Sequence, residues 1–118
     1  MTNRILLVED DPTSRRMLAT MLTDMGHGVT SAASGDEALQ YLYTDEPCDL
    51  VLADIVMPGM SGIELKDRAN DARPGLPLIL VSGKPSAISK VLDEGGLVLP
   101  KPVTRATLTS VIEDVLSR

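Results

Sequence analysis

Five runs of strand length alternate along this chain with segments that have the spacing of amphipathic helices, and this alternation constrains the fold strongly. The runs are residues 5–8, 29–33, 50–53, 78–81 and 97–99. Four of them are wholly apolar, and the run at 50–53 is typical of a strand buried on both faces of a sheet, while the more polar second run suits an edge strand. Right-handed helical crossovers join such strands in parallel. The chain is therefore predicted to be α/β, with one doubly wound, five-stranded parallel sheet and helices on both faces.

Helix-starting signals lie between these runs. Pro12 suits a first helical turn with Asp11 as its cap. Ser34 and Ser61 each precede a glutamate by three residues, which is the spacing of a capping box, and Thr104 is a cap candidate for the last helix. The helix expected between the fourth and fifth runs is short and weakly patterned. These signals predict where the helices begin.

The length and charge of the chain limit its class and its partners. The 118 residues suit one domain, residues 1–118, and the single cysteine excludes an internal disulfide. A net charge of -6 with scattered basic residues offers no surface for a phosphate backbone, so nucleic acid is not expected as a direct partner. No bilayer-spanning segment or signal peptide is visible, so we expect a cytoplasmic protein without membrane insertion.

Polar groups follow four of the five runs. The carboxyl ends of parallel strands lie at one edge of a sheet, where open α/β folds bind their ligands. We therefore expect these side chains to converge if the strands are neighbours. They are Glu9, Asp10, Asp11, Asp54, Ser82 and Lys101.

The acidic members of this set point to a cation. Asp10 and Asp11 brought close to Asp54 would repel one another unless a proton or a cation neutralised them. Mg²⁺ prefers oxygen ligands of this kind. The sequence therefore predicts a magnesium site at this edge of the sheet.

Asp54 is the candidate for covalent chemistry. It ends a buried strand, and Pro58 stiffens the loop that follows. Taken alone, Asp54 is equally consistent with a carboxylate that only hydrogen-bonds its own loop. A carboxylate can also accept a phosphoryl group covalently, and Lys101 and Ser82 could stabilise the phosphoryl oxygens. The whole set favours phosphoryl transfer.

These features, in this order, resemble the receiver domain of two-component response regulators, of the chemotaxis-regulator-like kind. The resemblance rests on the acidic residues 9–11, the segment 54–62 with its Asp-x-x-Met-Pro-Gly pattern, Ser82 and the Lys101-Pro102 pair. It covers essentially the whole chain. It implies a flavodoxin-like sheet with strand order 2-1-3-4-5 and a cis peptide bond before Pro102. It also implies that Asp54 takes a phosphoryl group from a phosphohistidine on a sensor histidine kinase or a histidine phosphotransfer protein.

The resemblance further implies roles for the other candidates. We assign Asp10 and Asp11 as the acidic pair nearest Mg²⁺, with Glu9 in support and the backbone carbonyl of Val56 as a further ligand. In addition, Lys101 would contact the phosphoryl oxygens.

Two positions depart from the family pattern. Ser82, which would move to hydrogen-bond the phosphate, stands where the family commonly has threonine and keeps the hydroxyl group. Val98 occupies the fifth-strand position at which the family usually carries an aromatic residue that rotates on phosphorylation. An aromatic switch is therefore not available to this chain.

The expected function is that of a phosphoacceptor in a two-component or phosphorelay system that switches protein–protein interactions, not of an enzyme beyond self-phosphorylation and autodephosphorylation at Asp54. A pseudo-receiver, which binds partners without being phosphorylated, is the main alternative. A phosphatase of the haloacid-dehalogenase type needs a second aspartate two residues after the nucleophile, where this chain has Val56. The kinase, the downstream partner and any longer parent protein stay open.

Overall fold

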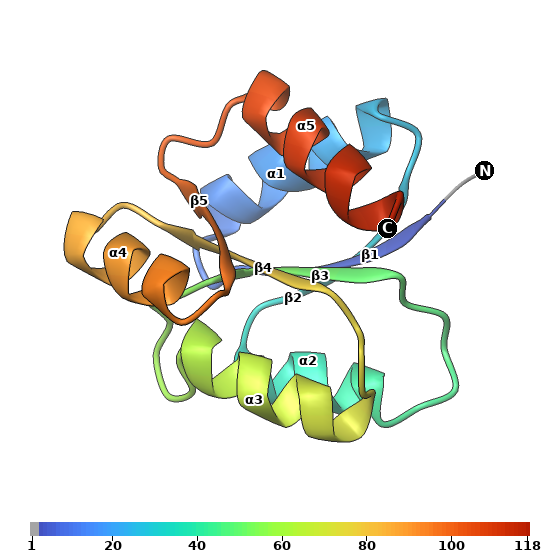
Figure 1. Cartoon of the computed structure of the whole chain (residues 1–118). Coiled ribbons are helices and arrows are strands. Elements are labelled where there is room, and N and C mark those ends of the chain that lie inside the picture. The colour runs from blue at the N-terminus through green and yellow to red at the C-terminus, as the bar shows by residue number, and fades with distance from the viewer. Residues whose placement is uncertain (1–2) are drawn as a thin grey trace.

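A computed structural model describes residues 3–118, and Figure 1 shows a central sheet of parallel strands with helices packed on both faces. Within these residues the sheet has five strands in the order β2-β1-β3-β4-β5, and every neighbouring pair is parallel. The predicted fold class and strand order are confirmed, and the more polar run is an edge strand as expected. The elements are β1 (Arg4–Val8), α1 (Pro12–Asp24), β2 (Gly28–Ala32), α2 (Gly35–Leu42), β3 (Leu50–Asp54), α3 (Gly62–Ala72), β4 (Leu78–Ser82), α4 (Pro85–Asp93), β5 (Leu97–Pro100) and α5 (Arg105–Leu116).

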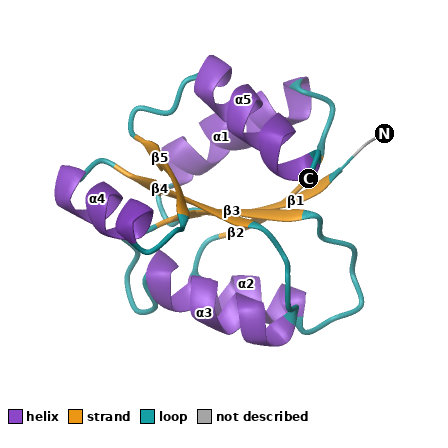
Figure 2. Cartoon of the chain, viewed as in Figure 1, coloured by secondary structure: helices purple, strands orange, loops and turns teal. Residues whose placement is uncertain are grey.

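Two aliphatic cores lie on opposite faces of the sheet. Helices α1 and α5 cover one face, and α2 and α3 cover the other (Figure 2). Along β1, Leu6 and Val8 pack into the core under α2 and α3, while Ile5 and Leu7 pack into the core under α1 and α5. This alternation follows from the two-residue period of a strand. The central strands therefore bury both faces, and their carboxyl ends are held in place.

The predicted helix caps are present. Asp11, Ser34, Ser61 and Thr104 each accept a hydrogen bond from the backbone N–H three residues later. Helix α4 differs because its N-cap residue, Lys84, makes no side-chain capping bond. In the part of the chain that the structure describes, no helix combines the length and the apolar character needed to cross a membrane.

The loop after β3 is fixed by close backbone packing. The N–H of Gly62 donates to the carbonyl of Ile55 at 2.9 Å. A Cβ atom at Gly62 would lie 2.3 Å from the carbonyl oxygen of Asp54, so glycine is required for this approach. Gly59 has a φ of 77°, which completes the turn. These contacts hold the start of α3 against the end of β3, where Asp54 lies.

Candidate functional site

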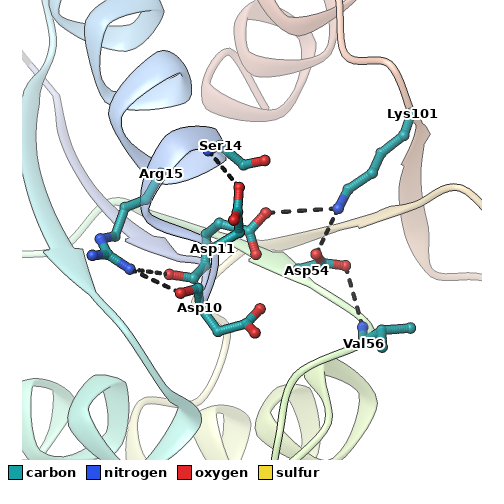
Figure 3. A network of polar contacts seen from close by, with 8 residues as sticks. Asp10, Asp11, Ser14, Arg15, Asp54, Val56 and Lys101 are labelled. Carbon is teal, nitrogen blue, oxygen red and sulfur yellow. Dashed lines mark hydrogen bonds and ion pairs between the residues drawn. The ribbon is translucent and has the colours of Figure 1, made fainter.

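The carboxyl ends of four strands bring the predicted residues to one edge of the sheet. Glu9 follows β1, Asp54 ends β3, Ser82 ends β4 and Lys101 follows β5. Figure 3 shows Lys101 reaching from its strand toward Asp54, with the acidic loop after β1 beside them. The expected convergence is therefore observed for these four residues.

Asp54 is held by two donors from different parts of the chain. Its side chain is nearly buried, and its Oδ2 atom lies 2.6 Å from the Nζ atom of Lys101. Its Oδ1 atom accepts a hydrogen bond of 3.2 Å from the backbone N–H of Val56. Asp54 thus does bind its own loop, but it also pairs with a residue 47 positions away.

Three carboxyl groups meet at this edge. Glu9, Asp10 and Asp54 each offer an oxygen atom, and within residues 3–118 these oxygens lie within 4.8 Å of one another. The side chain of Glu9 is only 2% exposed. Its Oε2 atom is buried without a hydrogen-bond partner among the described residues. The cluster has the donor atoms of a site for a hard cation.

The acidic pair that lies beside Asp54 differs from the expected pair, Asp10 and Asp11. Asp11 is exposed, and its carboxylate accepts a 2.8 Å hydrogen bond from the backbone N–H of Ser14, which lowers the pKa of Asp11. A carboxylate turned to the start of α1 as its cap does not join the cluster. Glu9 takes that place, because its N–H still donates to the carbonyl of Ala32 and holds the residue at the end of the strand. The pair beside Asp54 is therefore Glu9 and Asp10.

Burial and neighbouring charges shift the pKa values of Glu9 and Lys101. Burial first, and the charge of Asp54 second, raise the pKa of Glu9 to about 7. Burial alone would lower the pKa of Lys101, but the hydrogen bond to Asp54 and the charges of Asp54 and Glu9 outweigh it, so the pKa is raised. The Nζ atom of Lys101 lies 3.6 Å from Oε1 of Glu9. Lys101 therefore stays charged beside Asp54 and Glu9.

Ser82 lies beside this network but is turned to its own loop. It is 1% exposed, and its hydroxyl oxygen accepts a 3.0 Å hydrogen bond from the N–H of Lys84. Its carbonyl accepts a 2.9 Å bond from the N–H of Lys101, which ties β4 to the end of β5. The peptide bond between Lys101 and Pro102 is cis, as expected.

The structure also shows where Val56 and Val98 lie. Val56 is exposed beside Asp54, and its role as a carbonyl ligand stays a prediction. Val98 is partly buried on β5 and packs against the core that contains Val91 of α4.

One polar contact of the site was not predicted from the sequence. The Nη1 atom of Arg15 donates to the carbonyl oxygen of Glu9 at 2.8 Å and to that of Asp10 at 3.3 Å (Figure 3). The sequence offers only the weak signal of a basic residue within a helical turn of an acidic strand end, and Arg16 carries the same signal.

The chain is similar to proteins that are already described. A family model for the response regulator receiver domain matches residues 5–113. The response regulator receiver protein CpdR of Brucella abortus is 40% identical over 116 residues, which cover 96% of this chain and 96% of CpdR. The transcriptional regulatory protein GlrR of Escherichia coli is 34% identical over 117 residues, which cover 97% of this chain but 26% of GlrR.

A solved structure agrees with these matches. The response regulator receiver domain protein from Methanospirillum hungatei superposes with a TM-score of 0.87 at 32% identity, over 99% of this chain and 95% of that one. The chain spans about a quarter of the length of GlrR and nearly all of CpdR. With the sheet order and the strand-end residues described above, these matches show that the chain belongs to the family of response regulator receiver domains.

Proposed function

We propose that residues 1–118 form a phosphoacceptor domain in which Asp54 takes a phosphoryl group from a phosphohistidine. The observation that carries this proposal is the nearly buried Asp54 carboxylate, paired with Lys101 at 2.6 Å and adjoined by two further acidic side chains. The donor would be a sensor histidine kinase or a histidine phosphotransfer protein in the cytoplasm. The domain turns over no separate substrate and acts on its own Asp54.

The transfer needs access to an oxygen of the Asp54 carboxylate, whose side chain is 9% exposed. One of its oxygens forms the new bond to phosphorus, while the bond from phosphorus to the donor nitrogen breaks and the imidazole keeps that electron pair. Lys101 is 37% exposed at its side chain and extends from β5 over Asp54. It can therefore donate to a phosphoryl oxygen as the group arrives.

The acidic cluster fits Mg²⁺. The carboxylate oxygens of Glu9, Asp10 and Asp54 lie within 4.8 Å of one another, and oxygen atoms are the ligands that Mg²⁺ prefers. The unpartnered Oε2 atom of Glu9 supports the same assignment. When bound, the ion offsets the charge of the carboxylates and of the phosphoryl oxygens. Asp10, Asp54 and the carbonyl of Val56 would hold it, with Glu9 nearby in the cluster.

Ser82 and Lys101 complete the proposed site. The hydroxyl group of Ser82 would leave the N–H of Lys84 and donate a hydrogen bond to a phosphoryl oxygen. The output would be a change in protein–protein contacts. This change would not use the rotation of a fifth-strand aromatic ring, because residue 98 is a valine. A downstream protein partner follows from this proposal, with no direct nucleic-acid contact.

Labelling with acetyl phosphate and Mg²⁺, followed by intact-mass spectrometry, tests the assignment. The wild-type protein should gain one phosphoryl group, and Asp54→Asn should gain none because the amide is not a nucleophile of this kind. Asp45→Asn, which changes an exposed carboxylate away from the site, is the matched control and should be labelled like the wild type. Equal labelling of Asp54→Asn would remove the assignment.

A pseudo-receiver role is the second candidate, and the valine at position 98 is the feature that favours it. In that case the wild-type protein would stay unlabelled by acetyl phosphate and by any phosphorylated histidine kinase of its cell. It would also bind its partner equally well as wild type and as Asp54→Asn. Pull-down with the two proteins distinguishes the roles.

A further inference from the structure

We propose that Arg15 is a positioning residue that sets the geometry of the metal site, although its side chain contacts none of the carboxylates. The inference rests on the proposed function, because it concerns the Mg²⁺ site of that proposal. The inference is based on two hydrogen bonds that one guanidinium nitrogen of Arg15 donates to the backbone carbonyls of Glu9 and Asp10, at 2.8 Å and 3.3 Å.

These two carbonyls belong to the residues whose side chains complete the cluster. The sheet ladder pairs β1 only as far as Val8, so the peptide groups after Glu9 and Asp10 lie beyond the strand pairing. A peptide plane that can rotate carries the neighbouring side chain with it. Because Arg15 holds both carbonyls, it fixes the directions in which the Glu9 and Asp10 side chains leave the backbone.

The three-residue loop is held at each position by a different contact. The N–H of Glu9 is bound to β2, the carboxylate of Asp11 caps α1, and the carbonyl of Asp11 accepts from the N–H of Arg15 at 2.9 Å. Without the Arg15 side chain, Asp10 would have no side chain holding its carbonyl within the described residues. Arg15 is half-buried, whereas its neighbour Arg16 is exposed and makes no ion pair or side-chain hydrogen bond in residues 3–118.

The direction in which Mg²⁺ affinity changes when Arg15 is removed distinguishes a positioning role from a purely electrostatic one. Arg15 is a cation near a site for a cation, so by Coulomb's law its removal would tighten Mg²⁺ binding. If Arg15 positions the acidic loop, its removal weakens Mg²⁺ binding instead. Outer contacts that orient metal ligands typically contribute 10- to 100-fold to affinity.

The test compares Arg15→Gln with Arg16→Gln, which remove the same charge from adjacent positions of α1. Mg²⁺ is titrated into each protein and followed by amide NMR signals, and the same proteins are labelled with acetyl phosphate over a range of Mg²⁺ concentrations. Arg15→Gln should weaken Mg²⁺ binding about tenfold. Its labelling rate at saturating Mg²⁺ should stay within about twofold of wild type, since Arg15 touches no reacting atom. Arg16→Gln should bind Mg²⁺ within about twofold of wild type.

Each outcome of the Mg²⁺ titrations either supports or overturns the proposed role of Arg15. Equal or tighter Mg²⁺ binding by Arg15→Gln overturns the positioning role, and a wild-type protein that binds no Mg²⁺ overturns the proposed function and this inference together. If Arg15→Gln does not fold, Arg15→Lys replaces it. The lysine keeps the charge but loses the planar fork, so binding should weaken about threefold, and unchanged binding would again overturn the role.

Discussion

Glu9 is an acidic side chain buried at the end of a strand. Its carboxyl group lies beside Asp54, with one oxygen 3.6 Å from Lys101 and the other without a partner among the described residues. Burial and the charge of Asp54 raise its pKa from 4.5 to about 7. Without a bound cation, the folded protein therefore carries a proton on Glu9 at pH values at which the unfolded chain has lost it.

This proton makes stability depend on pH. Between pH 4.5 and about 7 the folded state binds a proton that the unfolded state lacks, so the free energy of unfolding falls as the pH rises through this window. Glu9→Gln is neutral at every pH and should lose this decline, becoming more stable than wild type above pH 7 in Mg²⁺-free buffer. Urea unfolding across the window measures it. Glu46→Gln, at an exposed position, should keep the wild-type decline.

Helix α3 begins against the end of β3, and glycine makes this contact possible. The approach of Gly62 to the carbonyl of Asp54 leaves no room for a side chain. The capping hydroxyl of Ser61 and the N–H of Gly62 fix the helix start from either side. The position of Asp54 therefore depends on how one helix packs against one strand.

Replacing this glycine should damage the packing. Gly62→Ala would place a Cβ atom against backbone, and overpacking of this kind costs about 1 to 3 kcal/mol of unfolding free energy. Gly83→Ala is the matched control, because its Cβ atom would meet only the Cβ atom of Lys101, at an ordinary 3.7 Å. We expect the control to stay within about 0.5 kcal/mol of wild type in urea unfolding. Equal stability of the two variants would contradict this account.

The sheet as a whole forces like charges together. Two aliphatic cores hold the strands in register, so the ends of β1 and β3 cannot separate to relieve the repulsion between their carboxylates. Lys101 offsets part of this charge. The stability of the domain and the proposed binding of a cation are therefore linked.

Mg²⁺ should stabilise the folded protein. At a free concentration 100 times the dissociation constant, the gain is about 2.7 kcal/mol, which raises the melting temperature by roughly 10 °C. Asp10→Asn should lose most of this shift, whereas Asp11→Asn should keep it, because asparagine also caps a helix and position 11 lies outside the cluster. Thermal melts with Mg²⁺, and with sodium salt at equal ionic strength, measure the shift. Loss of the shift in Asp11→Asn would return that residue to the metal site.

Much of the architecture follows from local pattern. The apolar runs indicated the strands, and the serines and threonine before the helices indicated their starts, because burial on two faces and capping leave signatures within a few residues. The convergence of Asp54, Ser82 and Lys101 could also be predicted, since the carboxyl ends of parallel strands share one edge.

Two features were decided only by tertiary structure. Three consecutive acidic residues cannot reveal which of them faces Asp54; the end of β1 and the start of α1 together turn Glu9 inward and Asp11 toward the helix. The contact of Arg15 with two carbonyls depends in the same way on the angle between a helix and a loop. Local propensity determines which elements form, but the direction of a side chain at their junction depends on how those elements pack.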